Sequence, residues 1–184
     1  MIAEKNLKHE IPIPEGVKAE ISEDGLLTIE GSNGNVSKLF DHPLVEIKIE
    51  ENKIKLFPKK FTKNEKILVN TFRAHIRNMI TGVGEQYTYK LKICSSHFPM
   101  TVNLEGDTLI VKNLFGEKVP RKAKILEGVK VKIEGEIITI QSPNKEAAGQ
   151  TAANIEQSTR ITNRDRRVFA DGIWITEKAG VPIK

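Results

Sequence analysis

The chain repeats itself once, and this repeat constrains the fold more than any other feature of the sequence. Residues 27–38, LTIEGSNGNVSK, align without gaps on residues 109–120, LIVKNLFGEKVP, and both segments reach a glycine at the same offset. Residues 47–56, IKIEENKIKL, align in the same way on residues 131–140, VKIEGEIITI. The two pairs are 82 and 84 positions apart, so they share one register. One long repeat in 184 residues indicates two copies of a domain, whereas a short period would indicate a solenoid.

Each copy is predicted to consist of strands followed by a helix. Apolar and polar residues alternate within residues 18–31 and 45–57 of the first copy and within 99–142 of the second, which predicts strands with one buried face. A helix follows over about 62–82, and its apolar stripe comprises Leu68, Phe72, Ile76, Met79, Ile80 and Val83. The second helix is predicted over about 145–158, with a small buried face of Ala148, Ala152 and Ile155. The order predicts an α+β fold of two tandem domains, each an antiparallel β-sheet with one helix packed on a face.

The two predicted domains differ in charge. Gly82 and Gly84 are placed to end the first helix, which predicts domains at 1–82 and 83–184. Residues 1–83 contain 13 Lys and Arg against 12 Asp and Glu, while the remainder contains 16 against 12. The segment 112–132 alone has seven cations and two carboxylates. A basic half joined to a nearly neutral half suggests that one half meets a polyanion, although a lysine excess also serves solubility.

The sequence contains no pattern that predicts an enzyme. Its four histidines are scattered without metal-ligand spacing, and no phosphate-binding glycine loop is present. Ser95 and Ser96 lie beside His97, but no GxSxG context frames them. The lone Cys94 excludes an internal disulfide and fits a reducing cytoplasm, and no run of about 18 apolar residues suggests a membrane span. We therefore expect no catalysis, metal, cofactor, small-molecule substrate or membrane.

The arginines of the chain gather near its C-terminus. Four of the seven fall within the segment 159–169, TRITNRDRRVF, here called the arginine segment and expected to be a basic C-terminal tail. Guanidinium groups offer planar, forked donors that suit phosphate oxygens and ribose hydroxyls. The alternative is surface pairing with Asp165, Asp171 and Glu156, but one aspartate within 160–167 leaves a surplus of positive charge.

The aromatic content of the chain indicates which kind of polyanion the basic half would bind. Aromatic residues make up only 5% of the chain, which argues against a stacking platform for single-stranded bases. Phe169, Ile173 and Trp174 are interpreted instead as anchors that hold the tail to the body. What remains is contact with structured, duplex-like RNA through its backbone and 2′-hydroxyl groups.

Several segments together resemble a known family. They are FRAHIRNMITGV in the first copy, the basic VKNLFGEKVPRKAKILEGVKV and the closing NIEQSTRITNRDRRVFADGIWITEK. Over about residues 7–178 the chain is similar to the L-six family of large-subunit ribosomal proteins, in its archaeal and eukaryotic branch (L-nine in eukaryotic naming). One departure is GSNG at 31–34, where many relatives have Gly-Pro-x-Gly.

The resemblance implies a ribosomal protein with two duplicated domains. It implies binding to large-subunit rRNA at the base of the lateral stalk, beside the sarcin–ricin loop and next to neighbouring ribosomal proteins, in the cytoplasm. RNA contact is expected mainly from the second domain and its tail. The leading contact group is then Arg160, Asn163, Arg164, Arg166 and Arg167. The second group is Lys112, Lys118, Arg121, Lys122 and Lys124. The third is Lys145 and Gln150, because backbone N–H groups at a helix start suit phosphate.

One alternative from another class stays open at this point. A free-standing adaptor would bind other proteins by adding their strands to the edges of its sheets. Such an adaptor would neither bind an rRNA fragment from the stalk base nor sediment with large subunits, so these two properties separate the hypotheses.

Overall fold

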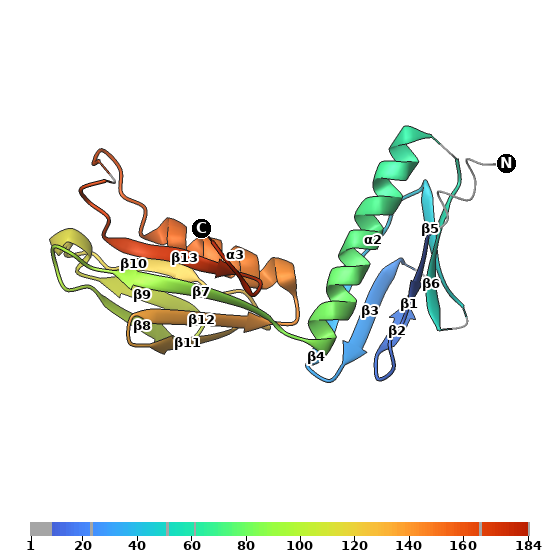
Figure 1. Cartoon of the computed structure of the whole chain (residues 1–184), viewed down its shortest axis with the longest axis horizontal. Coiled ribbons are helices and arrows are strands. Elements are labelled where there is room, and N and C mark those ends of the chain that lie inside the picture. The colour runs from blue at the N-terminus through green and yellow to red at the C-terminus, as the bar shows by residue number, and fades with distance from the viewer. Residues whose placement is uncertain (1–8, 23, 51, 61, 166, 184) are drawn as a thin grey trace. The chain divides into compact units, whose positions relative to one another are not determined.

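The chain folds into two compact units (Figure 1). The structure is a computed structural model that describes residues 9–22, 24–50, 52–60, 62–165 and 167–183. The units are Met1–Gln86 and Tyr87–Lys184, each with its own hydrophobic core. The division therefore lies four residues beyond the predicted boundary at 82/83. The reason is that the first long helix continues through buried Gly82 and ends at Gly84.

The described residues of the first unit form six strands and one helix. Its elements are β1 (His9–Pro12), β2 (Lys18–Ile21), β3 (Leu26–Gly31), β4 (Gly34–Leu39), β5 (Val45–Glu50), β6 (Lys53–Pro58) and α2 (Lys63–Gly84). The strands form two antiparallel three-stranded sheets, in the orders β1-β6-β5 and β2-β3-β4. Helix α2 packs against strands of both sheets.

The second unit repeats this plan and adds to it. Its elements are β7 (Tyr87–Cys94), β8 (Thr101–Glu105), β9 (Thr108–Lys112), the 3₁₀ turn η1 (Leu114–Gly116), β10 (Arg121–Lys124), β11 (Lys130–Glu134), β12 (Ile137–Ser142), α3 (Lys145–Ser158), β13 (Gly172–Lys178) and β14 (Val181–Pro182). The sheet β10-β9-β8 corresponds to β4-β3-β2, and β11-β12-β7 corresponds to β5-β6-β1. Strands β13 and β14 then extend the second sheet beyond β7.

These observations confirm the α+β fold of two duplicated domains and refine one part of it. Each unit has two sheets instead of the single sheet expected from the alternating pattern. In the first unit β2 and β5 are neighbours, yet no ladder of backbone hydrogen bonds joins them. Twisted strands that wrap around one helix separate at such a seam, and the sequence pattern does not reveal where pairing stops.

Both helices bury the faces that the sequence predicts. In α2, Ile76, Met79 and Val83 are buried, and the rest of the predicted stripe packs against them. Helix α3 covers Lys145–Ser158 as predicted and buries Ala148, Ala152 and Ile155. Asn144 caps it, because its side-chain oxygen accepts hydrogen bonds from the first turn. The small alanine side chains allow this helix to approach its sheet closely.

The GSNG hairpin of the first unit is fixed to the end of helix α2. The side-chain amide of Asn33 donates to the carbonyl oxygens of Val83 and Gly84, and the backbone N–H of Asn33 also donates to Val83. A Cβ atom on Gly31 would lie 2.9 Å from Cβ of Val83, so only glycine fits there. These contacts hold the loop although it lacks the proline of many relatives.

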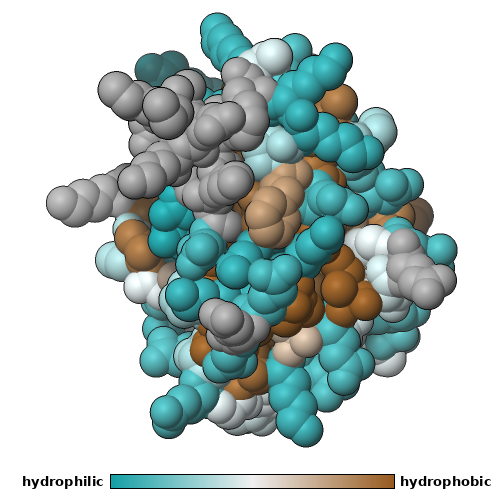
Figure 2. All heavy atoms as spheres, turned by 90° about the vertical axis from the view of Figure 1, so that its right-hand side faces the viewer, coloured by the Kyte–Doolittle hydropathy of each residue, from teal (hydrophilic) through white to brown (hydrophobic). Residues whose placement is uncertain are grey.

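The face of the molecule drawn in Figure 2 is mostly polar. Figure 2 shows one face, on which hydrophobic atoms form separate areas between hydrophilic side chains. In the part of the chain that the structure describes, no helix combines the length and the apolar character needed to cross a membrane.

Candidate nucleic-acid interface

The arginine segment is a loop rather than a free tail. It leaves helix α3, which ends at Ser158, and leads into β13, which begins at Gly172. Strand β13 pairs with β7 in the middle of the five-stranded sheet, with Gly172 opposite Cys94 and Ile173 opposite Ile93. Both ends of the segment are therefore fixed. This corrects the expectation of a C-terminal tail, and the physical reason is that the apolar run after Phe169 forms a strand of the core sheet.

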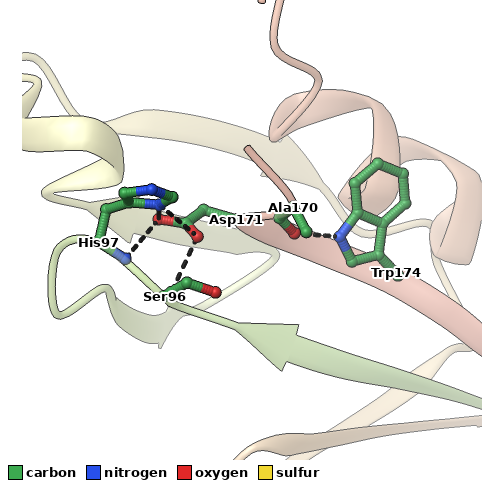
Figure 3. A network of polar contacts seen from close by, with 5 residues as sticks. All are labelled: Ser96, His97, Ala170, Asp171 and Trp174. Carbon is green, nitrogen blue, oxygen red and sulfur yellow. Dashed lines mark hydrogen bonds and ion pairs between the residues drawn. The ribbon is translucent and has the colours of Figure 1, made fainter. Parts of the chain in front are cut away.

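The buried carboxylate of Asp171 and a hydrogen bond from Trp174 hold the exit of the loop in place (Figure 3). Asp171 is 2% exposed, and its carboxylate accepts hydrogen bonds from the backbone N–H of Ser96 at 2.8 Å and of His97 at 3.1 Å. The ring Nδ1 of His97 lies 3.2 Å from the same carboxylate. Trp174 Nε1 donates to the carbonyl oxygen of Ala170. Burial alone would raise the pKa of Asp171, but the hydrogen bonds from Ser96 and His97 outweigh it and keep the pKa below its usual value.

This network is not a catalytic triad. In a triad the hydroxyl donates to an imidazole base, which is oriented by the carboxylate. Here Ser96 and His97 both donate backbone N–H groups to Asp171, so the carboxylate joins the loop after β7 to the start of β13. Among the described residues Asp171 pairs with His97 and with no arginine, which argues against one of the alternative pairs considered from the sequence.

The described arginines of the segment lie in three different environments. Arg160 is exposed. Arg164 is exposed too, but its Cζ lies 5.4 Å from the ring centroid of Phe115 and 5.0 Å from that of Phe169. Arg167 forms a bidentate pair with Asp165, with Nη2 2.8 Å from Oδ2, and hydrogen bonds from Arg167 keep the pKa of Asp165 below its usual value.

The remaining members of the leading group complete the loop. Asn163 is exposed and adopts a left-handed backbone conformation with φ of 62°, which turns the chain between Arg160 and Arg164. Arg166 lies outside the described residues. Glu156, the third acidic partner considered from the sequence, accepts a hydrogen bond from the backbone N–H of Ile175. Among the described residues of the segment, only Arg167 has a carboxylate partner, so most of its positive charge stays on the surface.

Arg121 connects the second predicted group to the arginine segment. Its guanidinium binds Glu117 with Nη2 and Nε, and its Nη1 donates to the carbonyl oxygens of Ser158 at 3.1 Å and Arg160 at 2.9 Å. The hydrogen bond from Arg121 keeps the pKa of Glu117 below its usual value. Arg121 thus holds β10 against the end of α3. Its donors are used within the protein, which the sequence did not indicate.

The lysines of the second group surround this connection. On β10, Ala123 is buried while Lys122 and Lys124 point outward on the opposite face. Lys112 is exposed at the end of β9, and Lys118 is exposed in the loop before β10. The structure therefore places these lysines on the same part of the unit as the start of the arginine segment.

The third group lies apart from the arginine segment. Lys145 begins α3 with its Nζ 5.4 Å from the ring centroid of Tyr87, whereas the arginine segment begins at the other end of the helix, roughly 20 Å away. The N–H groups of Glu146 and Ala147 already bind the Asn144 side chain, which leaves fewer donors for a phosphate. Gln150 binds Asn154, which in turn donates to the carbonyl oxygen of Lys124.

Sequence reasoning named Phe169 as an anchor of the segment but missed the rings of His97 and Phe115 that lie beside it. His97, Phe115 and Phe169 come from three loops and lie together, with His97 and Phe169 stacked at 5.1 Å between ring centroids. The first and last of these residues are 72 positions apart, so no local motif links them. Within the described residues, no group of three or more His, Cys, Asp and Glu is arranged to hold a metal ion.

Comparison with known proteins agrees with this architecture. The family model described as ribosomal protein L6 matches the chain twice, at residues 13–86 and 98–172. The chain belongs to the ribosomal protein L6 family. It is 48% identical over 182 residues to large ribosomal subunit protein uL6 of Nanoarchaeum equitans, which covers 95% of this chain and 94% of that protein. The two matches of the L6 model fall in the two units, one in each.

Two further L6 relatives are also archaeal. Large ribosomal subunit protein uL6 of Methanococcus vannielii is 46% identical over 177 residues, with 95% of each chain covered. The protein of the same name from Methanosarcina mazei is 44% identical over 175 residues, covering 95% of this chain and 99% of that protein. Membership of the L6 family confirms the resemblance drawn from the sequence and the expectation that the chain is a structural ribosomal protein and not an enzyme.

Proposed function

We propose that the chain is a structural protein of the large ribosomal subunit that binds folded rRNA mainly through its second unit. The binding site is the base of the lateral stalk, near the sarcin–ricin loop and beside neighbouring ribosomal proteins. The contact surface consists of the arginine segment with its Arg160, Asn163, Arg164, Arg166 and Arg167, and of the lysines around β10. Lys145 and Gln150 are a separate, weaker contact. Ribosomes translate mRNA in the cytoplasm, and the protein acts there as part of the large subunit.

One observation carries this proposal within the family. Arg121 uses its own donors to hold the arginine segment next to β10, so two basic groups far apart in sequence form one surface. A loop fixed at both ends loses less conformational freedom on binding than a free tail. Guanidinium groups held in this way suit the repeating phosphates and 2′-hydroxyls of an RNA helix.

Removal of the arginines tests the proposal. The triple variant Arg164→Ala, Arg166→Ala and Arg167→Ala is titrated against an rRNA fragment from the stalk base, with fluorescence anisotropy as the readout. Loss of three charge-assisted contacts is expected to weaken binding by about 10- to 1,000-fold. Circular dichroism should show an unchanged fold, because the described members of this set are exposed.

A matched variant in the first unit controls for charge alone. Lys48, Lys66 and Arg77 are exposed cations there, and their joint change to alanine removes the same formal charge. Little change in affinity is expected from this control. If the triple arginine variant binds as tightly as the unchanged protein, the arginine segment is not part of the interface. If the unchanged protein does not bind the fragment, the stalk-base site is wrong.

A further inference from the structure

Four side chains from three loops form one stacked cluster in the second unit, here called the Arg164 stack. Its members are His97, Phe115, Arg164 and Phe169. The rings of Phe115 and Phe169 meet edge to face at 5.8 Å, and His97 lies against both at 5.9 and 5.1 Å between centroids. The Cζ of Arg164 lies over both phenylalanine rings, at 5.4 and 5.0 Å from their centroids. Two of the ten Phe, Tyr and Trp residues of the chain belong to this cluster, together with His97.

The backbone is arranged to present these rings. Phe115 has a left-handed conformation with φ of 49° and ψ of 31°, which is unusual for a bulky residue and costs free energy. Next to it, Leu114 is buried and anchors the turn, and the Asn113 side chain donates to the carbonyl oxygen of Pro99. On the opposite side the backbone N–H of Phe169 donates to the carbonyl oxygen of Asp165. The turn thus holds Phe115 at the edge of the core, with its ring close to Arg164.

The carboxylate of Asp171 holds His97 in place. Its backbone N–H and its ring Nδ1 both contact the buried carboxylate of Asp171. The imidazole is thereby fixed in the orientation that stacks on Phe169 at an interplanar angle of 30°. The cluster is therefore supported by the core sheet, and each of its rings is positioned by a contact outside the cluster.

An arginine in this setting differs from one that only carries charge. The two rings lie within cation–π distance of the guanidinium, and these contacts restrict the side chain to few rotamers. Arg164 is nevertheless exposed, so its side chain remains accessible to a ligand. Proteins that bind unpaired RNA bases stack them on aromatic rings and on the planes of arginine guanidiniums. A phosphate contact would need only the charge and would not use two supporting rings.

We propose that the Arg164 stack binds one unpaired base of the RNA, which stacks on the outer side of the Arg164 guanidinium. This inference rests on the proposed function, because it assigns one element of the RNA to one part of that surface. Stacking tolerates any base, and a purine gains most because its ring system is larger. The rest of the surface holds the folded RNA by its backbone, so the stack adds a local contact with a single nucleotide.

The substitution Arg164→Lys separates stacking from charge. Lysine keeps the positive charge but has no plane on which a base can stack. With the stalk-base rRNA fragment, we expect this variant to bind about 5- to 100-fold more weakly than the unchanged protein. The slope of log affinity against log salt concentration should stay the same, because the number of positive charges is unchanged. The matched control is Arg160→Lys, for which a change of less than about twofold is expected, since Arg160 is not a member of the Arg164 stack.

A second variant and a second readout complete the test. Phe169→Leu keeps an apolar side chain but removes a ring from the stack, and it should weaken binding in the same direction as Arg164→Lys. Thermal unfolding monitored by the fluorescence of Trp174 establishes that this variant is folded at the temperature of the assay. Chemical probing of the RNA should show one unpaired nucleotide that is protected by the unchanged protein and reactive in the presence of Arg164→Lys.

The outcomes distinguish this inference from the proposed function. If the unchanged protein fails to bind the fragment, the proposed function fails and the inference fails with it. If the unchanged protein binds and Arg164→Lys binds equally well, only the stacking inference is overturned. A weaker Arg164→Lys complex with a reduced salt slope would assign Arg164 to a phosphate and would also overturn it.

Discussion

Asp171 shows how a single buried carboxylate determines the path of the chain around the interface. Its side chain is 3% exposed, and it binds the backbone of Ser96 and His97, which are more than 70 positions away in sequence. The carboxylate is tolerated in the interior because these donors replace the lost water. Asp171 thereby fixes both the end of the arginine segment and the position of His97 in the Arg164 stack.

The substitution Asp171→Asn tests this role through its pH dependence. Asparagine keeps one acceptor oxygen but replaces the other with an NH2 group, which cannot accept the hydrogen bonds that Ser96 and His97 donate. We therefore expect a loss of about 1–3 kcal/mol in the unfolding free energy of the second unit near pH 7. The pKa of Asp171 is lower in the folded state than in the unfolded state. Its contribution is therefore complete above the unfolded value of about 3.9 and is lost as the pH falls through the lower folded value.

Urea unfolding followed by Trp174 measures this effect, because Trp174 is the one tryptophan of the chain and lies in β13. The difference between the unchanged protein and Asp171→Asn should shrink as the pH is lowered through that range. The exposed Asp107 provides a matched control, since Asp107→Asn is expected to change stability by less than about 0.5 kcal/mol. A difference that stays constant with pH would show that the charge of Asp171 does not stabilise the fold.

At the scale of elements, the two copies diverge at the loop that we propose to be part of the RNA surface. In the first unit β3 and β4 are joined by the tight GSNG hairpin, whose Gly31 and Gly34 pair directly. In the second unit the corresponding connection spans residues 113–120 and includes the turn η1. The two sequences still align without gaps, yet the longer connection carries Phe115 and Lys118. The longer loop of the second unit thus takes the place of a structural hairpin, and we propose that it forms part of the interface.

Arg121 connects the loop 113–120 to the start of the arginine segment. The substitution Arg121→Lys tests this connection. A lysine ammonium cannot bind Glu117 in a bidentate way and also bind the carbonyl oxygens of Ser158 and Arg160. Hydrogen bonds to charged groups contribute about 1.5–3 kcal/mol, so amide hydrogen exchange in residues 158–161 should accelerate by about tenfold or more.

Lys122→Arg on the same strand is the matched control, because it keeps the charge and leaves the contacts of Arg121 in place. Its exchange pattern in residues 158–161 should equal that of the unchanged protein. Equal exchange in Arg121→Lys as well would mean that the carbonyl contacts do not hold the end of helix α3.

For the whole molecule, the structural boundary sharpens the division of charge. Residues 1–86 contain 13 Lys and Arg and 13 Asp and Glu, whereas residues 87–184 contain 16 and 11. The entire formal net charge of +5 thus belongs to the second unit. A polyanion is attracted to this unit, and the neutral first unit remains available for other contacts.

The salt dependence of RNA binding tests this division. The double variant Lys122→Gln and Lys124→Gln removes two exposed charges from β10, and the slope of log affinity against log salt should fall by about 2. The matched double variant Lys48→Gln and Lys66→Gln in the first unit should leave the slope unchanged. Titrations of the stalk-base rRNA fragment between about 50 and 200 mM salt measure both. Equal slopes for both double variants would contradict a contact through β10.

The sequence predicts the parts of this structure that depend on local periodicity. Helix α3 begins and ends where its pattern predicts, and the buried faces of both helices follow from the spacing of their apolar residues. The duplication is visible because two segments kept their register over more than 80 positions. The apolar patterns of strands and helices repeat every two or nearly four residues, so they can be recognised in a single sequence.

The interface itself depends on contacts that are distant in sequence. Nothing local indicates that His97 meets Asp171, that Arg121 reaches the carbonyl oxygens after α3, or that Phe115 supports Arg164. The arginine segment was recognised by composition, but its closure by β13 depends on pairing with a strand formed 78 positions earlier. Whether each predicted side chain contacts RNA stays a prediction.

The pairing of β13 with β7 also has a consequence for synthesis of the protein. Gly172 pairs with Cys94, so about 78 residues are translated between the two partners. At roughly 5–20 residues per second, one side of β7 lacks its partner for roughly 4–16 seconds on every nascent chain. During that interval the unsatisfied backbone groups of β7 can pair with a foreign strand. The arginine segment is therefore synthesised during the interval in which β7 of the nascent chain can pair with a foreign strand.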